Sequence, residues 1–155
     1  MGYPKNNKWH QGIYTPINKN KYMGTNNPVY RSALERDFFL FFDKSSNVTA
    51  WVSEGIVVPY YNDVDHKVHN YYVDLIAAIK EKDGTVQKYL IELKPWTQTQ
   101  PPKQSDTKKR STVLYEHLMY HKNQCKWKAA SEYAAKKGMK FVVLTEKYLT
   151  QSCPS

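Results

Sequence analysis

Residues 68–94 constrain the fold of this chain more than any other stretch. They hold two runs rich in Val, Ile, Leu and Tyr, separated by Lys82-Asp83-Gly84. Strand-like runs on either side of a turn that contains Gly predict a β-hairpin. A three-residue loop with Gly84 at positive φ would place residue 81 opposite residue 85, and this fixes the register of the whole hairpin.

This register brings two acidic side chains and one basic side chain together. It places Asp74 opposite Glu92, with Cβ atoms about 4.5–5.5 Å apart. Lys94 shares the face of Glu92, because side chains alternate along a strand. A two-residue turn at Asp83-Gly84 would instead shift the pairing by one residue and put the two acids on opposite faces.

Two carboxylates at this distance repel each other, and a divalent cation removes the repulsion. The pattern therefore predicts a Mg²⁺ site, in which Mn²⁺ is expected to substitute. Asp74 and Glu92 both stand inside apolar runs, where a charge normally has a partner. A solvated acidic patch is the alternative. With the metal present, Lys94 could orient a water or offset negative charge during phosphodiester hydrolysis.

The order of these residues resembles the PD-(D/E)xK nuclease family, with Val73 in place of the usual Pro. This resemblance implies an α/β fold with a restriction-endonuclease-like core, in which helices flank a mixed central β-sheet. The family also places an acidic residue on an upstream helix, and Glu35 matches that position. The implied catalytic residues are Glu35, Asp74, Glu92 and Lys94, and the implied metal ligands are Glu35, Asp74, Glu92 and the carbonyl of Leu93. The order is also similar to the endonuclease subunit of heteromeric cut-and-paste transposases, including His69 and residues 141–146.

Residues 1–27 form a basic, aromatic N-terminal arm that carries four lysines and no acidic residue. Its lysines could meet phosphates while its aromatic rings stack on bases; alternatively, Trp9, Ile13 and Tyr14 pin the arm to the core. The sequence from Trp9 to Tyr14, followed by Tyr30-Arg31-Ser32, resembles the head completion nucleases of T-even-type tailed phages. That resemblance implies phage head or neck proteins as partners. It also implies a place in the host cytoplasm during assembly, or in the virion.

Length and charge agree with a single DNA-binding domain. The chain has 155 residues and a formal net charge of +9, which favours one compact core and a polyanionic partner. No apolar run approaches the roughly 20 residues of a membrane span, and no signal-peptide pattern opens the chain. Cys125 and Cys153 fit neither a disulfide framework nor a zinc pattern. His117 and His121 are four residues apart but lack the zinc-protease Glu, so zinc is not expected.

The first helix is predicted over residues 28–43. Asn27 with Pro28 could start it, or Ser32 and Glu35 could form a capping box for a later start. The expected apolar stripe consists of Leu34, Phe38, Phe41 and Phe42. Glu35 is therefore either a metal ligand or a capping carboxylate, and Arg31 could meet Glu35 or a DNA phosphate. Strands are expected over residues 48–53 and 55–61. Residues 62–66 are expected in a solvated loop, and cation binding by its two acids, Asp63 and Asp65, is the alternative.

The segment after the hairpin is strongly basic and polar. Residues 97–107 are predicted to be a loop, and residues 112–137 a long helix with a buried stripe of Leu114, Leu118, Cys125, Ala129 and Tyr133. Residues 141–144 are predicted to be an interior strand, and Thr145 is expected to cap a short last helix. A basic loop beside the acidic face suits the DNA backbone, although a merely solvated loop is the alternative. The candidate DNA-binding residues are Arg31, Lys103, Lys108, Lys109, Arg110, Lys122, Lys126 and Lys128.

The chain is therefore expected to hold a nuclease domain over residues 28–150, between the arm and a frayed tail at 151–155. The expected function is Mg²⁺-dependent cleavage of double-stranded, packaged DNA, which permits head–tail joining. Two alternatives stay open: a DNA-binding structural adaptor that does not cut, and an endonuclease of a mobile element. The sequence does not indicate an oligomeric state.

Overall fold

The predicted hairpin forms the centre of the structure, a computed structural model that describes residues 11–151. β6 (Leu75–Lys80) pairs antiparallel with β7 (Val86–Leu93), and Leu75 lies opposite Ile91. Glu81 N donates to Thr85 O at 2.7 Å, and Gly84 has a φ of 88°. The three-residue loop and its register are confirmed, because the pairs from Leu75–Ile91 to Lys80–Val86 follow the predicted register. The pairing ends at Leu75, so the opposition of Asp74 and Glu92 stays a prediction from that register.

The hairpin belongs to a four-stranded sheet of order β3-β6-β7-β8. β3 (Val48–Ser53) runs antiparallel to β6, whereas β8 (Lys140–Leu144) runs parallel to β7. The prediction of an interior strand at 141–144 was wrong, because β8 is an edge strand. Its apolar run has a different cause: Val142 and Leu144 pack on one face of the sheet and Phe141 on the other.

The first run of residues 68–94 is not one strand but two. β5 (Lys67–Tyr72) leaves the central sheet and pairs with β4 (Val57–Asn62) in a separate two-stranded sheet. The break falls at Val73 and Asp74, where the β3–β4 connection takes over the backbone hydrogen bonds. Val73 N donates to Ile56 O at 3.2 Å, and Glu54 N donates to Asp74 O at 2.9 Å. The chain therefore turns a corner between two sheets at Asp74.

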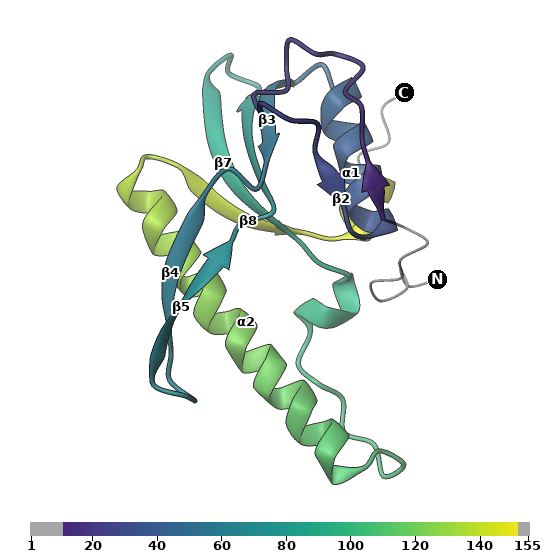
Figure 1. The fold of residues 1–155 in the computed structure, drawn as a ribbon, viewed down its shortest axis with the longest axis vertical. Helices are drawn as coiled ribbons and strands as arrows, with labels where there is room; N and C mark the ends of the chain where they lie inside the picture. Colours follow the sequence, from purple (N-terminus) through teal and green to yellow (C-terminus); the bar gives the residue numbers. More distant parts are fainter. Residues whose placement is uncertain (1–10, 152–155) are drawn as a thin grey trace.

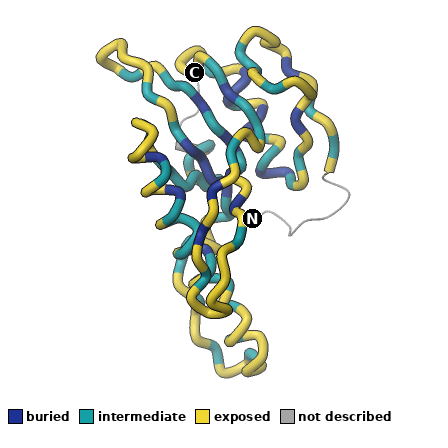
Figure 2. Tube along the Cα trace, turned by 60° about the vertical axis from the view of Figure 1, so that its left-hand side comes forward, coloured by how far each residue is buried: buried dark blue, intermediate teal, exposed yellow. Residues whose placement is uncertain are grey.

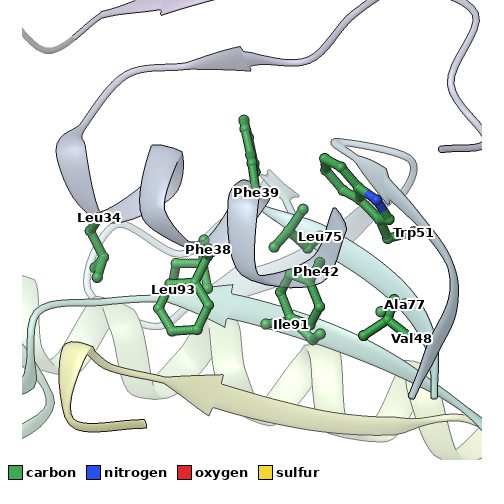
Figure 3. Packing of buried hydrophobic residues seen from close by; sticks show 10 residues of the cluster. All are labelled: Leu34, Phe38, Phe39, Phe42, Val48, Trp51, Leu75, Ala77, Ile91 and Leu93. Carbon is green, nitrogen blue, oxygen red and sulfur yellow. The ribbon is translucent and has the colours of Figure 1, made fainter. Parts of the chain in front are cut away.

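Two helices cover opposite faces of the central sheet (Figure 1), which confirms the α/β class with a mixed sheet between helices. α1 (Ala33–Lys44) packs Leu34, Phe38 and Phe42 against alternate residues of β6 and β7, as Figure 3 shows. α2 (Arg110–Lys136) packs Ala130 and Ala134 on the other face. The chain also forms β1 (Gly12–Ile13), β2 (Val29–Tyr30), the 3-10 helix η2 (Trp96–Thr99) and α3 (Glu146–Gln151). As expected, Thr145 precedes α3, and its hydroxyl accepts from Lys147 N at 3.3 Å.

The start of α1 follows one of the two predicted alternatives. Ser32 is the N-cap, and its hydroxyl accepts from Glu35 N at 3.1 Å. The start at Asn27 and Pro28 was wrong, because residues 29–30 are β2, which pairs with β1. The stripe needs one correction: Phe39 is buried, while Phe41 is only partly buried.

The buried stripe of α2 is confirmed only towards its C-terminus. Ala129 and Tyr133 pack towards the sheet, whereas Leu114 is 61% exposed and Leu118 is 40% exposed. The N-terminal half of α2 runs beyond the sheet (Figure 1), and this lower part of the molecule is mostly exposed (Figure 2). None of the helices in residues 11–151 has the length and apolar character needed to cross a bilayer.

The described part of the N-terminal arm is anchored to α1. The buried Asp43 accepts from Tyr14 OH at 2.6 Å, from Ile17 N at 2.7 Å and from Asn18 N at 2.9 Å. Tyr14 was correctly expected to pin the arm to the core. Ile13 is 68% exposed and was wrongly included, and Trp9 lies outside the described residues, as does the tail from 152.

Candidate active site

The C-terminal end of β7 holds Glu92 at the centre of a small polar cluster. Glu92 is 6% exposed, and its Oε1 lies 3.7 Å from Lys94 Nζ. The Tyr71 hydroxyl donates a short hydrogen bond to the other carboxylate oxygen. Burial raises the pKa of Glu92 to about 7, although the nearby Lys94 and Lys126 ammonium groups lower it. The fold thus keeps this carboxylate where its negative charge is costly.

Asp74 stands at the corner between β5 and β6, one residue before Leu75, which pairs with Ile91 next to Glu92. Its Oδ2 accepts a hydrogen bond from Leu93 N at 2.8 Å. Burial raises the pKa of Asp74 to about 7, and the negative charges of Glu35 and Glu54 raise it further against the lowering effect of that hydrogen bond. A second carboxylate with a raised pKa is therefore tied directly to the Glu92-Leu93-Lys94 segment.

Glu35 lies in the first turn of α1 and plays the capping role. Its Oε2 accepts from Arg31 N at 2.9 Å, while its own N–H bonds the Ser32 hydroxyl. Burial raises the pKa of Glu35. The Glu35 charge also raises the pKa values of Asp74 and Glu92, so its carboxylate lies close enough to act on both. The cap is observed, and the role of metal ligand stays a prediction.

The donor set suits a hard divalent cation. Glu35 acts electrostatically on Asp74 and Glu92 at one end of the sheet, and the pKa values of all three are raised. To bind one ion, the carboxylate oxygens of Glu35, Asp74 and Glu92 would have to move closer to one another. Within residues 11–151, the trio of ligand atoms that lies within 4.8 Å belongs to Asp63, His121 and Cys125 instead.

Two residues beside the site were not predicted from the sequence. Tyr71 reaches Glu92 from β5, and Glu54 contacts the Arg31 guanidinium in a short ion pair. Glu54 adopts a φ of 54°, in the left-handed region, directly after β3. The contact of Tyr71 with Glu92 could have been predicted only by recognising the break at Val73. In one continuous strand, Tyr71 would lie away from Glu92. The pair Glu54-Gly55 is a weak turn signal and gives no hint of the contact with Arg31.

The predicted DNA-binding residues fall into two groups. Lys126 lies at the acidic site: its Nζ is 5.4 Å from the Tyr71 ring centroid, and the Glu92 and Asp74 charges act on it. Burial lowers the pKa of Lys126, and the neighbouring Lys122 charge lowers it further. The second group follows the exposed arm formed by α2 and the loop before it. In that group Lys103, Lys109, Arg110 and Lys128 are exposed, whereas Lys108 pairs with Glu116 at 2.9 Å.

Comparison with known proteins gives two matches. The family described as "TnsA-like endonuclease N terminal" matches residues 45–146, which include Asp74, Glu92 and Lys94 but not Glu35. The chain is also 37% identical over 141 residues to the head completion nuclease of Enterobacteria phage T4. That match covers 88% of this chain and 91% of the phage protein.

Proposed function

Because this chain belongs to the TnsA-like endonuclease family and is a relative of the phage T4 head completion nuclease, we propose that it is a metal-dependent DNA nuclease. Its substrate is double-stranded DNA packaged in a phage head, and trimming that DNA permits head–tail joining. The nuclease domain spans residues 28–150. It works in the host cytoplasm during assembly and contacts head or neck proteins.

The arrangement of a buried Glu92 and a partly buried Asp74 next to one ammonium carries this proposal. Asp74 directly precedes β6, Glu92 lies near the end of the neighbouring β7, and Lys94 lies on the same short segment as Glu92. Both acids have pKa values raised to about 7 by burial. A fold that keeps two acids in this state without a cation loses stability, so the arrangement favours a resident metal ion.

In the proposed site, Asp74, Glu92, Glu35 and the Leu93 carbonyl hold Mg²⁺, and Mn²⁺ can replace it. When bound, the ion supplies charge that polarises the scissile phosphoryl group and makes water more acidic. Lys94 positions the attacking water and offsets negative charge that develops in the transition state. Tyr71 holds one oxygen of Glu92, which leaves its second oxygen towards Lys94.

DNA phosphates are proposed to bind the basic residues around the site and along the exposed arm. Charges of the acidic cluster act on Arg31 and on Lys126, and Lys122 neighbours Lys126. The others, Lys103, Lys108, Lys109, Arg110 and Lys128, continue along the loop and α2. Contacts to phosphates alone would give binding that is strong at low salt and independent of base sequence.

The substitution Asp74→Asn tests the proposal. The amide oxygen of Asn can still accept from Leu93 N, so the fold should persist, whereas one charged metal ligand is lost. We expect plasmid cleavage with Mg²⁺ or Mn²⁺ to disappear and the EDTA-treated variant to be at least as stable as the native protein. Asp106→Asn is the matched control, because it removes the same charge from an exposed loop position.

Native protein that binds DNA but does not cut it with either metal would favour the structural adaptor instead. Cleavage that survives in Asp74→Asn would remove Asp74 from the site. DNA binding should be measured alongside in EDTA, since only the cutting step depends on the metal in this proposal.

A further inference from the structure

A second cluster of metal-ligating side chains lies away from the carboxylate site. The turn between β4 and β5 carries Asp63, and one face of α2 carries His121 and Cys125. Asp63 Oδ1 contacts His121 Nε2 in a short ion pair. Their ligand atoms, with Cys125 Sγ, all lie within 4.8 Å of one another. Three different donor types from two separate elements therefore meet at one point.

The spacing of these atoms is close to that of a tetrahedral zinc site. Cys125 Sγ lies 3.6 Å from His121 Nε2 and 3.9 Å from Asp63 Oδ1. Zinc bond lengths of about 2.0–2.3 Å place ligand atoms roughly 3.3–3.7 Å apart in a tetrahedron. The Cys–His separation already fits, and the Asp–His pair would open slightly to admit the ion. His121 and Cys125 are four residues apart on α2, which places both on the same face.

The surroundings also suit a bound cation. The side chains of Asp63 and His121 are 56% and 46% exposed, so an ion can enter from solvent. The Asp63 backbone is held in a turn by two bonds to side chains, from Val64 N to Asn62 Oδ1 at 2.9 Å and from Lys67 N to Asp65 Oδ1 at 3.0 Å. One carboxylate and one thiolate would neutralise the charge of a divalent ion. This mixture of sulfur, imidazole and carboxylate donors favours Zn²⁺ over Mg²⁺.

We propose that Asp63, His121 and Cys125 bind one Zn²⁺, with water as the fourth ligand, and that the ion clips the β4–β5 turn to α2. Near this clip, β5 presents Tyr71 to Glu92, and α2 presents Lys126 to the Tyr71 ring. The zinc would thus fix one wall of the carboxylate site without taking part in its chemistry. The inference does not depend on the proposed nuclease activity.

Zinc and cobalt binding to the full-length protein tests this inference. With Mg²⁺ in excess to occupy the carboxylates, we expect about one equivalent of Zn²⁺ to compete successfully with a chromophoric chelator and raise the unfolding temperature. Co²⁺ should give a thiolate charge-transfer band. Trypsin should cut more slowly after Lys67, the exposed first residue of β5, once zinc is bound.

Variants of the three ligands have matched controls in the same chain. Asp63→Asn, His121→Gln and Cys125→Ser should each weaken zinc binding by at least about tenfold, since even outer-shell changes around a metal reach that size. Asp65→Asn, His117→Gln and Cys153→Ser should bind as the native protein does. Asp74→Asn should keep the zinc. A missing cobalt band, a band that survives Cys125→Ser, or zinc binding lost in Asp74→Asn would each overturn the assignment.

Discussion

At the scale of single residues, Tyr71 has the most specific contact with the proposed site. Its hydroxyl donates to Glu92, and its ring lies under the Lys126 ammonium. Tyr71→Phe removes the hydroxyl and keeps the ring. We expect the maximal cleavage rate to fall by about tenfold, as for other groups that orient a metal ligand. Single-turnover cleavage with saturating Mg²⁺ measures this.

The neighbouring Tyr72 gives a control for that substitution. It is 60% exposed and points the other way from Tyr71 along β5, so Tyr72→Phe should leave the rate unchanged. Equal effects of the two substitutions, or none at Tyr71, would show that the hydroxyl does not orient Glu92.

The raised pKa values of Asp74 and Glu92 predict a pH dependence of stability in EDTA. Burial raises both to about 7, above the unfolded values near 4. The native state therefore binds more protons than the unfolded state between pH 4 and 7, and stability falls as the pH rises through that window. The loss is on the order of several kcal/mol, and it levels off above the folded pKa values.

Urea unfolding at a series of pH values, with and without Mg²⁺, measures this effect. With saturating Mg²⁺, stability should fall less as the pH rises, because the ion neutralises the charge of the ionised carboxylates. The apparent Mg²⁺ affinity should rise with pH up to about 7 and then level off, since protons compete for the same oxygens. In Asp74→Asn, both the fall in stability and the rise in Mg²⁺ affinity with pH should be smaller. A metal-free protein whose stability does not decline between pH 5 and 8 would contradict the raised pKa values.

The register of the β6–β7 hairpin could be predicted because a short turn sets it, and that turn is encoded by adjacent residues. The contacts of Tyr71 and Glu54 could not, because they join strands that are distant in sequence. The cap at Glu35 was predictable, since a capping box is a local pattern of Ser32 and Glu35, whereas its role as a metal ligand stays a prediction.

At the scale of elements, the first turn of α1 separates capping from metal binding at Glu35. Ser32→Ala removes the acceptor for Glu35 N and should cost about 1 kcal/mol of stability, with the metal-dependent cleavage rate preserved. Glu35→Gln keeps a side-chain oxygen that can accept from Arg31 N, so stability should hold while cleavage falls. Chemical unfolding and cleavage rates on the same samples measure both.

If Glu35→Gln lowered stability and left the cleavage rate unchanged, Glu35 would be a structural cap alone. Glu132→Gln controls for the lost charge, since Glu132 lies on an exposed position of α2.

Elements were predicted best where the pattern is local, as in β3 and the hairpin. The break at Val73 was missed because the residues before and after it are equally apolar, and the cause lies in hydrogen bonds from the β3–β4 connection. The edge position of β8 was missed because packing on both faces produces the same apolar run as pairing on both sides. The exposed half of α2 was missed because its leucines keep the spacing of a buried stripe.

At the scale of the whole molecule, the basic residues at the start of α2 are expected to bind DNA. Lys109 is the N-cap and Arg110 the first residue, and the first turn holds no acid. Cations here oppose the helix dipole, whereas a phosphate would be favoured. Replacing Lys109 and Arg110 together by Gln should weaken DNA binding at all sequences and reduce the salt slope by about 2. Titrations at several salt concentrations measure it.

The control replaces Lys80 and Lys82 by Gln, because these exposed lysines lie at the end of β6 and in the β6–β7 turn, at the other end of the molecule (Figure 1). For this control variant, the slope of log DNA affinity against log salt concentration should equal that of the native protein. The stability of the Lys109 and Arg110 variant should not fall, and equal slopes for the two variants would place the DNA elsewhere.

The corner at Val73 and Asp74 has a mechanical consequence. The segment that joins β5 to β6 carries both the Asp74 carbonyl that accepts from Glu54 N and the Asp74 carboxylate that accepts from Leu93 N. A rotation of the β4–β5 ribbon about this corner is therefore expected to shift the Asp74 carboxylate, so a molecule bound at the far end of the ribbon would alter the geometry of the acid pair.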